Sequence, residues 1–113
     1  MEFRLELEES GRLHCHITQM DQTTSFSAYD GPMALTLLRA ATDDLVRDGC
    51  GECYWQMASG EYRLLFRRTD EHTVRVAVLW ANGIVTGWEH ILWTECPEPE
   101  WVEAVYGELA KAA

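Results

Sequence analysis

The sequence predicts a single α+β domain over residues 1–113, with one antiparallel β-sheet, element order βββ-α-ββββ-α, and two helices packed on one face of that sheet. Two observations carry this prediction: a series of apolar runs separated by short turns between residues 60 and 93, and two segments with helical periodicity that follow strand-like segments. Strands in hairpin order with separate helices are typical of α+β proteins. A chain of 113 residues is long enough to bury a core.

The N-terminal segment predicts three strands. Apolar and polar residues alternate over residues 3–8 and again over residues 13–18, and this period of two is typical of half-buried strands. A third strand is expected over residues 24–29, with Phe26 and Ala28 on its inner side.

The main helix is predicted to follow Asp30 and to end at Gly49. Asp30 or Gly31 can serve as the N-cap, and Pro32 lacks the N–H group that would need a partner in a first turn. Glycine favours the left-handed conformation that often ends a helix. The buried side of this helix should comprise Ala34, Leu37, Leu38, Ala41 and Leu45.

Four strands are predicted after the helix, the first over residues 52–57. In the next two, one face should carry Tyr62, Leu64 and Phe66, followed by Val74, Val76, Val78 and Trp80. Asn82 and Gly83 supply the two residues of a type I′ hairpin turn.

The last strand is expected over residues 84–93, where Gly87 indicates a bulge or a close approach of another backbone. Residues 94–99 are predicted to form a loop. The second helix should begin at Pro99, with glutamates in its first turns, where the helix dipole favours negative charge.

Composition narrows the classes of partner. The chain has 9 basic and 19 acidic residues, which give a formal net charge of −10 at pH 7. This charge repels nucleic acids and anionic membranes, so we expect neither as a partner. The sequence lacks the roughly 20-residue apolar run of a membrane span, and its N-terminus lacks the pattern of a signal peptide. We therefore expect a cytoplasmic protein.

The negative charge is concentrated towards the C-terminus. The glutamates Glu95, Glu98, Glu100 and Glu103 are predicted to form an acidic face that binds a basic protein, because complementary charge accelerates encounter. The alternative is a solvated face that only aids solubility.

A second candidate site lies on the predicted meander. Arg63, Arg67 and Arg75 should share one face of the sheet with Tyr54. Guanidinium groups bind carboxylates and phosphates in a bidentate manner, so this face is a candidate site for a small molecule or an anion. The alternative is that these arginines form cross-strand pairs with glutamates.

A third candidate is the motif formed by Cys50 and Cys53. A CxxC pair can bind metal, but tetrahedral zinc needs four ligands, and the other two would have to come from elsewhere, such as His14 and His16. A redox role is disfavoured, because the predicted helix precedes the motif rather than following it. The simpler interpretation places Cys50 in a loop and Cys53 in the core. We predict no cofactor.

The five tryptophans divide into two groups. Trp55, Trp80 and Trp101 fit the core. Trp88 and Trp93 have no clear place in it, and an exposed tryptophan would mark a contact surface, because tryptophan is enriched at binding hot spots.

In size, charge and layout, the chain is similar to small acidic bacterial α+β proteins, among them immunity proteins that neutralise basic nuclease toxins. The acidic face and the absence of catalytic motifs predict a non-enzymatic protein-binding module of this immunity or inhibitor kind. We identify no catalytic motif in the sequence and predict no enzyme activity. The alternatives are the anion-binding domain and the structural zinc protein described above. A homodimer through an edge strand, either residues 1–8 or residues 24–29, is also compatible with the sequence.

Overall fold

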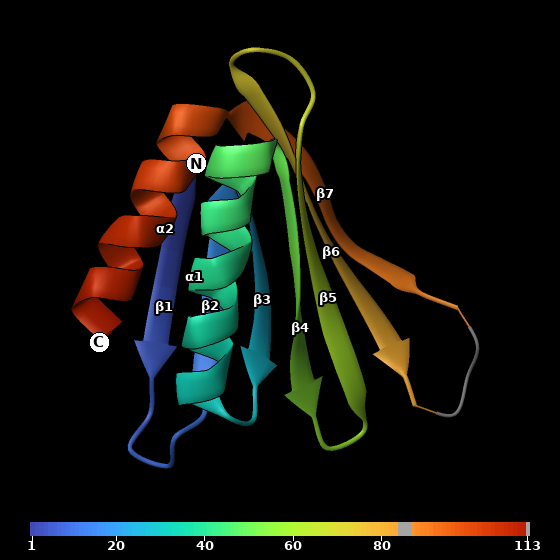
Figure 1. Cartoon of the computed structure of the whole chain (residues 1–113). Coiled ribbons are helices and arrows are strands. Elements are labelled where there is room, and N and C mark those ends of the chain that lie inside the picture. The colour runs from blue at the N-terminus through green and yellow to red at the C-terminus, as the bar shows by residue number, and fades with distance from the viewer. Residues whose placement is uncertain (84–86, 113) are drawn as a thin grey trace.

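The computed structural model describes residues 1–83 and 87–112, and in these residues the elements follow the predicted order (Figure 1). The elements are β1 (Glu2–Leu7), β2 (Leu13–Gln19), β3 (Gln22–Ala28), α1 (Gly31–Asp48), β4 (Cys50–Met57), β5 (Gly60–Arg68), β6 (Thr73–Asn82), β7 (Glu89–Pro97) and α2 (Glu98–Ala112).

The prediction of a single sheet with both helices on one face is wrong. The described strands form two antiparallel sheets, sheet A with the order β1-β2-β3 and sheet B with the order β4-β5-β6-β7. The chain passes from one sheet to the other through α1, and a backbone hydrogen bond of 2.9 Å from the Tyr29 N–H to the Gln56 carbonyl links the two edges. Figure 1 shows α1 in front of sheet A and beside β4, with α2 next to β1. Alternation identifies the buried face of a strand, but it does not identify the strand with which it pairs.

The inner faces of both sheets and the buried sides of both helices contribute to one hydrophobic cluster. Aromatic contacts join its parts. Phe26 of sheet A packs on Trp55 of sheet B with ring centroids 5.3 Å apart, and Phe66 of sheet B packs on Trp101 of α2 at 5.4 Å. The predicted core positions of Trp55 and Trp101 are therefore confirmed, whereas Trp80 is only half-buried.

The predicted ends of α1 are confirmed. The Asp30 carboxylate accepts a hydrogen bond of 3.1 Å from the Met33 N–H, which identifies Asp30 as the N-cap. Gly49 has a φ of 84°, and its N–H donates to the Leu45 carbonyl at 2.8 Å. The type of residue at each end, aspartate at the N-terminus and glycine at the C-terminus, is sufficient to set both ends of this helix.

The C-terminal elements differ from the prediction. The expected loop over residues 94–99 is wrong, because Thr94 to Pro97 continue β7 and pair with residues 73–76 of β6. The helix α2 follows β7 directly. The predicted type I′ turn at Asn82 and Gly83 is wrong, because Asn82 still belongs to β6 and neither residue has a positive φ. Residues 84–86, where the last strand was expected to begin, lie outside the described residues. Gly87 has a φ of 107° with open space around it, so its role is a left-handed backbone and not a close approach.

The helix α2 covers the free edge of β1. Trp101 packs edge-on against Phe3, with ring centroids 5.2 Å apart. One turn from the C-terminus, the Glu108 carboxylate accepts a hydrogen bond of 3.0 Å from the backbone N–H of Leu5. A side chain of α2 thus satisfies a backbone donor that points away from β2.

The helix α1 lies unusually close to β4 at Gly51. A Cβ atom on this glycine would lie 2.0 Å from the carbonyl oxygen of Ala41, which is far inside van der Waals contact. Only glycine permits this approach without movement of the helix or the strand.

Arg68, at the end of β5, ties both helices to sheet B. Its guanidinium donates to the Glu98 carboxylate at the start of α2, at 2.7 and 2.9 Å, and to the Leu45 carbonyl near the end of α1, at 3.1 Å. Its backbone N–H donates to the Gly49 carbonyl at 2.8 Å. One side chain therefore fixes the C-terminus of α1 and the N-terminus of α2 to the same strand.

The contact at Gly51 yields a stability prediction. We expect Gly51→Ala to lower the free energy of unfolding by about 1–3 kcal/mol, because the added methyl group must push α1 away from β4. The midpoint of urea unfolding measures this change.

Gly107→Ala is the matched control, because Gly107 lies in α2 with open space where the Cβ would be added. Alanine has the higher helix propensity, so this substitution should stabilise the protein by about 0.5–1 kcal/mol. Equal midpoints for the two variants would contradict a tight contact at Gly51.

Candidate functional site

The outer face of sheet B is the candidate site, and the alternation of each strand determines which side chains lie on it. Trp55, Phe66 and Val76 are buried on the inner face, so their neighbours along each strand point outward. Strand pairing arranges these outward residues in rows across the sheet. The first row contains Cys50, Arg67, Arg75 and Glu95, the second Glu52, Leu65, Ala77 and Trp93, and the third Tyr54, Arg63, Leu79 and His90.

Large aromatic side chains are exposed on this face. Trp93 is 56% exposed, Trp88 37% and Tyr54 36%. The His90 ring stacks on Trp93, with ring centroids 5.7 Å apart and an interplanar angle of 7°. The sequence did not assign Trp88 or Trp93 to the core, and in the structure both lie at the surface.

Two of the three predicted arginines are paired with glutamates and also lie over these aromatic rings. Arg63 donates to Glu52 at 2.7 and 3.1 Å, and its guanidinium carbon lies 5.7 Å from the Tyr54 ring centroid and 5.8 Å from that of Trp88. The hydrogen bond to Glu52 raises the pKa of Arg63. These contacts hold both rings in defined positions.

Arg75 repeats this arrangement at the other end of the face. It donates to Glu95 at 3.0 and 3.3 Å, and its guanidinium lies 5.1 Å from the Trp93 ring centroid. The alternative of cross-strand ion pairs thus describes Arg63 and Arg75. It does not describe Arg67. The backbone of Arg67 pairs with β4 and β6, but its exposed side chain forms no hydrogen bond or ion pair with another described residue.

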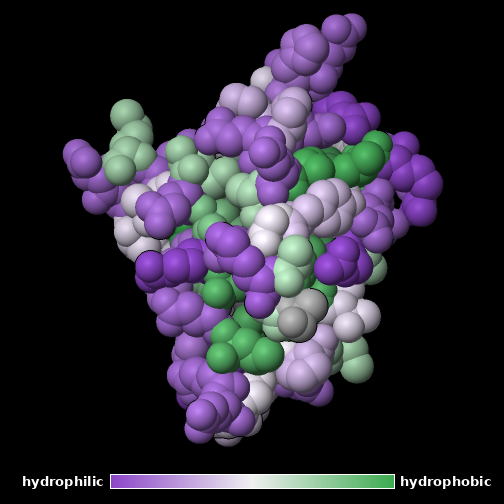
Figure 2. All heavy atoms as spheres, turned by 90° about the vertical axis from the view of Figure 1, so that its left-hand side faces the viewer, coloured by the Kyte–Doolittle hydropathy of each residue, from purple (hydrophilic) through white to green (hydrophobic). Residues whose placement is uncertain are grey.

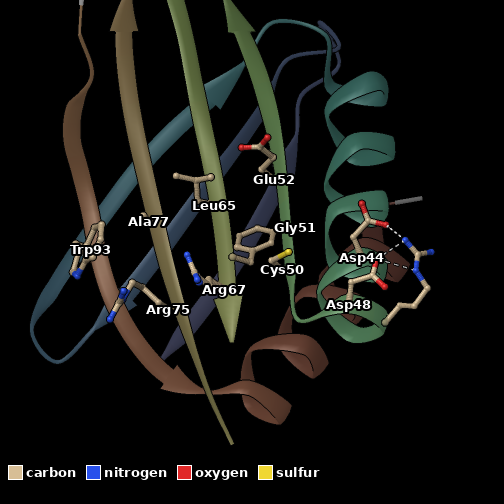
Figure 3. A pocket seen from close by; sticks show the side chains of 12 residues that line it. Asp44, Asp48, Cys50, Gly51, Glu52, Leu65, Arg67, Arg75, Ala77 and Trp93 are labelled. Atoms are coloured by element: carbon tan, nitrogen blue, oxygen red, sulfur yellow. Dashed lines mark hydrogen bonds and ion pairs between the residues drawn. The ribbon is translucent and has the colours of Figure 1, made fainter. Parts of the chain in front are cut away.

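Arg67 lies in an open hollow of about 590 Å³ between the C-terminal turn of α1 and the outer face. Figure 3 shows Arg67 between Cys50 on one side and Arg75 and Trp93 on the other, with the α1 residues forming a wall. The lining residues are Asp44, Arg47, Asp48, Cys50, Gly51, Glu52, Leu65, Phe66, Arg67, Arg75, Ala77 and Trp93. The close approach of α1 at Gly51 places this wall beside the sheet.

The four glutamates of the predicted acidic face do not lie together as one free surface. Glu95 lies on the outer face of sheet B and is bound to Arg75, whereas the Glu98 side chain is only 15% exposed and is bound to Arg68. Glu100 lies 3.4 Å from the amino group of Met1, and Glu103 is exposed. Figure 2 shows the side of the molecule on the left of Figure 1 as largely hydrophilic, with smaller hydrophobic areas between.

The two cysteines of the CxxC motif lie on opposite faces of β4. Cys50 is exposed, at the first position of the strand and not in a loop, whereas Cys53 is 4% exposed in the core. Burial raises the pKa of Cys53 to about 12. His14 and His16 lie on the outer face of sheet A, so the structure does not assemble the predicted zinc ligands. Within residues 1–83 and 87–112, no three His, Cys, Asp or Glu side chains are placed to hold a metal ion.

The two histidines instead form polar contacts on sheet A. His14 lies between Ser27, at 2.6 Å, and the Glu8 carboxylate, and this hydrogen bond lowers the pKa of Glu8. His16 contacts Ser25 at 2.8 Å. The sequence alone did not predict these partners. The only signal was that Ser25 and Ser27 are two residues apart in β3, as His14 and His16 are in β2. The contacts fix the orientation of both rings on an otherwise exposed surface.

The burial of the thiols leads to a reactivity prediction. Cys50 is the one exposed cysteine, whereas Cys15, Cys53 and Cys96 are buried. We expect a thiol reagent such as DTNB at pH 8 to modify Cys50 rapidly in the folded protein and the other three only after denaturation. Burial raises the pKa of all three, so their thiols stay protonated at this pH.

Mass spectrometry of the modified peptides identifies the reacting residue, and a Cys50→Ser variant provides the control. Rapid modification of Cys53 in the folded protein would contradict its position in the core.

Among the described residues, neither helix is long and apolar enough to cross a membrane. Comparisons with protein-family models, curated proteins and solved structures gave no match.

Proposed function

We propose that the chain is a non-enzymatic protein-binding module and that it contacts its partner through the outer face of sheet B. One observation carries this proposal: Trp93, Trp88 and Tyr54 are exposed together on one face. Tryptophan, tyrosine and arginine are the residues most enriched at the energetic centres of protein interfaces. An exposed group of this composition has little use in a chain that binds nothing.

The face is also held rigid before a partner arrives. Arg63 and Arg75 lie over the aromatic rings while bound to glutamates of neighbouring strands. Beneath them, Ala77 and Leu79 are 2% and 8% exposed, although they point out of the sheet. Side chains that are ordered in advance lose little entropy on binding, which favours affinity.

The net charge bears on the kind of partner. With a formal charge of −10, the chain attracts a basic protein at long range and increases the rate of encounter. The acidic residues are spread over the molecule, and Glu95 and Glu98 are already paired, so we assign them to this long-range attraction. The close contact is assigned to the aromatic residues.

The two alternatives have weaker support. A small-anion site built on three arginines loses two of them to Glu52 and Glu95. A zinc site loses its geometry because Cys50 and Cys53 point to opposite faces of β4. We propose no enzyme activity.

The test is binding by a Trp93→Ala variant. Affinity capture from a lysate of the source organism identifies the partner, and calorimetry with the purified partner gives the dissociation constant. We expect Trp93→Ala to weaken binding about 10-fold or more, because truncation of a hot-spot tryptophan typically costs more than about 1.4 kcal/mol. Affinity should also fall as salt is raised.

Met33→Ala is the matched control, because Met33 is 54% exposed on α1 and does not line the outer face of sheet B. It should leave the affinity unchanged. A partner that binds both variants as tightly as the unmodified chain would place the interface elsewhere.

A further inference from the structure

We propose that the hollow around Arg67 binds a carboxylate group of the partner, carried on a peptide segment next to an apolar side chain. This inference rests on the proposed protein-binding function and specifies the chemistry of part of the interface. It follows from the charges that line the hollow, from the pairing of the strands and from the apolar residues beside Arg67.

The charges around the hollow leave one guanidinium without a partner. On the α1 wall, Arg47 binds Asp44 at 2.6 Å and Asp48 at 3.0 Å. On the sheet, Glu52 is bound by Arg63, and Arg75 is bound to Glu95. Each carboxylate near the hollow is therefore engaged by another arginine, and Arg67 has no partner among the described residues.

Strand pairing places a second guanidinium beside the unpaired side chain of Arg67. Arg67 on β5 lies directly opposite Arg75 on β6. Like charges at directly opposed positions of an antiparallel pair are destabilising. An anion bound at Arg67 would relieve this repulsion and could form the bidentate hydrogen bonds that a guanidinium group favours.

The rest of the hollow suits an apolar group. Leu65, Ala77 and Trp93 occupy one row of the sheet beside Arg67. A volume of about 590 Å³ is in the range of sites that accept a small ligand or a few side chains. A segment with an apolar side chain over Trp93 and a carboxylate at Arg67 would use both properties.

A carboxylate fits better than a phosphate. The lining includes three carboxylates, from Asp44, Asp48 and Glu52, and only one unpaired cation. A phosphate dianion would be repelled more strongly by these groups than a monoanion. A basic partner can supply the carboxylate, because long-range attraction depends on net charge and the contact at Arg67 is local.

Cys50 provides a reporter inside the hollow. It is exposed and lies directly opposite Arg67 in the first row. Its thiolate attacks the methylene carbon of iodoacetate or iodoacetamide, the carbon–iodine bond breaks, and iodide leaves. The two reagents differ only in the carboxylate, so the ratio of their rate constants measures recognition of that group and cancels changes in thiolate fraction.

The first measurement is this rate ratio at Cys50, by mass spectrometry, in folded and in urea-unfolded protein. We expect folding to raise the ratio of iodoacetate to iodoacetamide about fivefold, as one nearby cation would. Arg67→Gln should abolish this increase. Arg39→Gln removes the same charge from an exposed position on α1 outside the hollow, and it should retain the increase. A ratio unaffected by Arg67→Gln would overturn the proposal.

The second measurement uses N-acetylphenylalanine and its carboxamide as probes that protect Cys50 from iodoacetamide. We expect protection by the acid at millimolar concentration, at least about fivefold weaker protection by the amide, and loss of the difference in Arg67→Gln. Equal protection by both probes would overturn the proposal. Micromolar protection by the free acid would also overturn it, because the hollow would then be a small-molecule site.

The two proposals fail in different ways. If Trp93→Ala weakens partner binding while Arg67→Gln changes neither the rate ratio nor the protection, the interface stands and the carboxylate site is wrong. If partner binding is insensitive to Trp93→Ala, the interface lies elsewhere than on the outer face of sheet B, and the assignment of the carboxylate to the partner fails with it.

Discussion

The contact between α1 and β4 at Gly51 is the constraint on which the candidate site depends. Backbone meets backbone there, with the Ala41 carbonyl 2.0 Å from the position of an added Cβ. This contact brings the last turn of α1 beside the outer face of sheet B. Arg68 secures the same corner from the other side by bonding to the end of α1 and to Glu98. Without this corner, the hollow at Arg67 would lose one of its walls.

Features set by nearby residues were predictable from the sequence. Asp30 and Gly49 mark the ends of α1 because each satisfies backbone groups within a few residues. Alternation places Val74, Val76 and Val78 in the core, and the structure agrees. The division into two sheets was not predictable, because it depends on which strand edges meet across the 18 residues of α1.

The candidate site shows the same limit. Alternation along β7 would put Trp93 on the face opposite His90, yet the two rings stack on the outer face. The cause is an irregularity between Val78 and Leu79, where the pairing with β7 shifts by one residue. Such a shift reverses the orientation of every residue beyond it. The arginines and Tyr54 on the outer face were predictable, but the stacking of His90 on Trp93 on that face depends on this shift.

The hydrogen bond from the Leu5 N–H to Glu108 has a consequence for the behaviour of the protein at high concentration. An unprotected edge of a sheet is a template on which strands of other molecules can assemble into aggregates or fibres. Here a carboxylate from α2 occupies a donor site that an incoming strand would need, and Trp101 anchors the helix over the same edge. Polymerisation through β1 therefore requires α2 to detach first. The C-terminal helix thus hinders aggregation at this edge, in addition to contributing to the core.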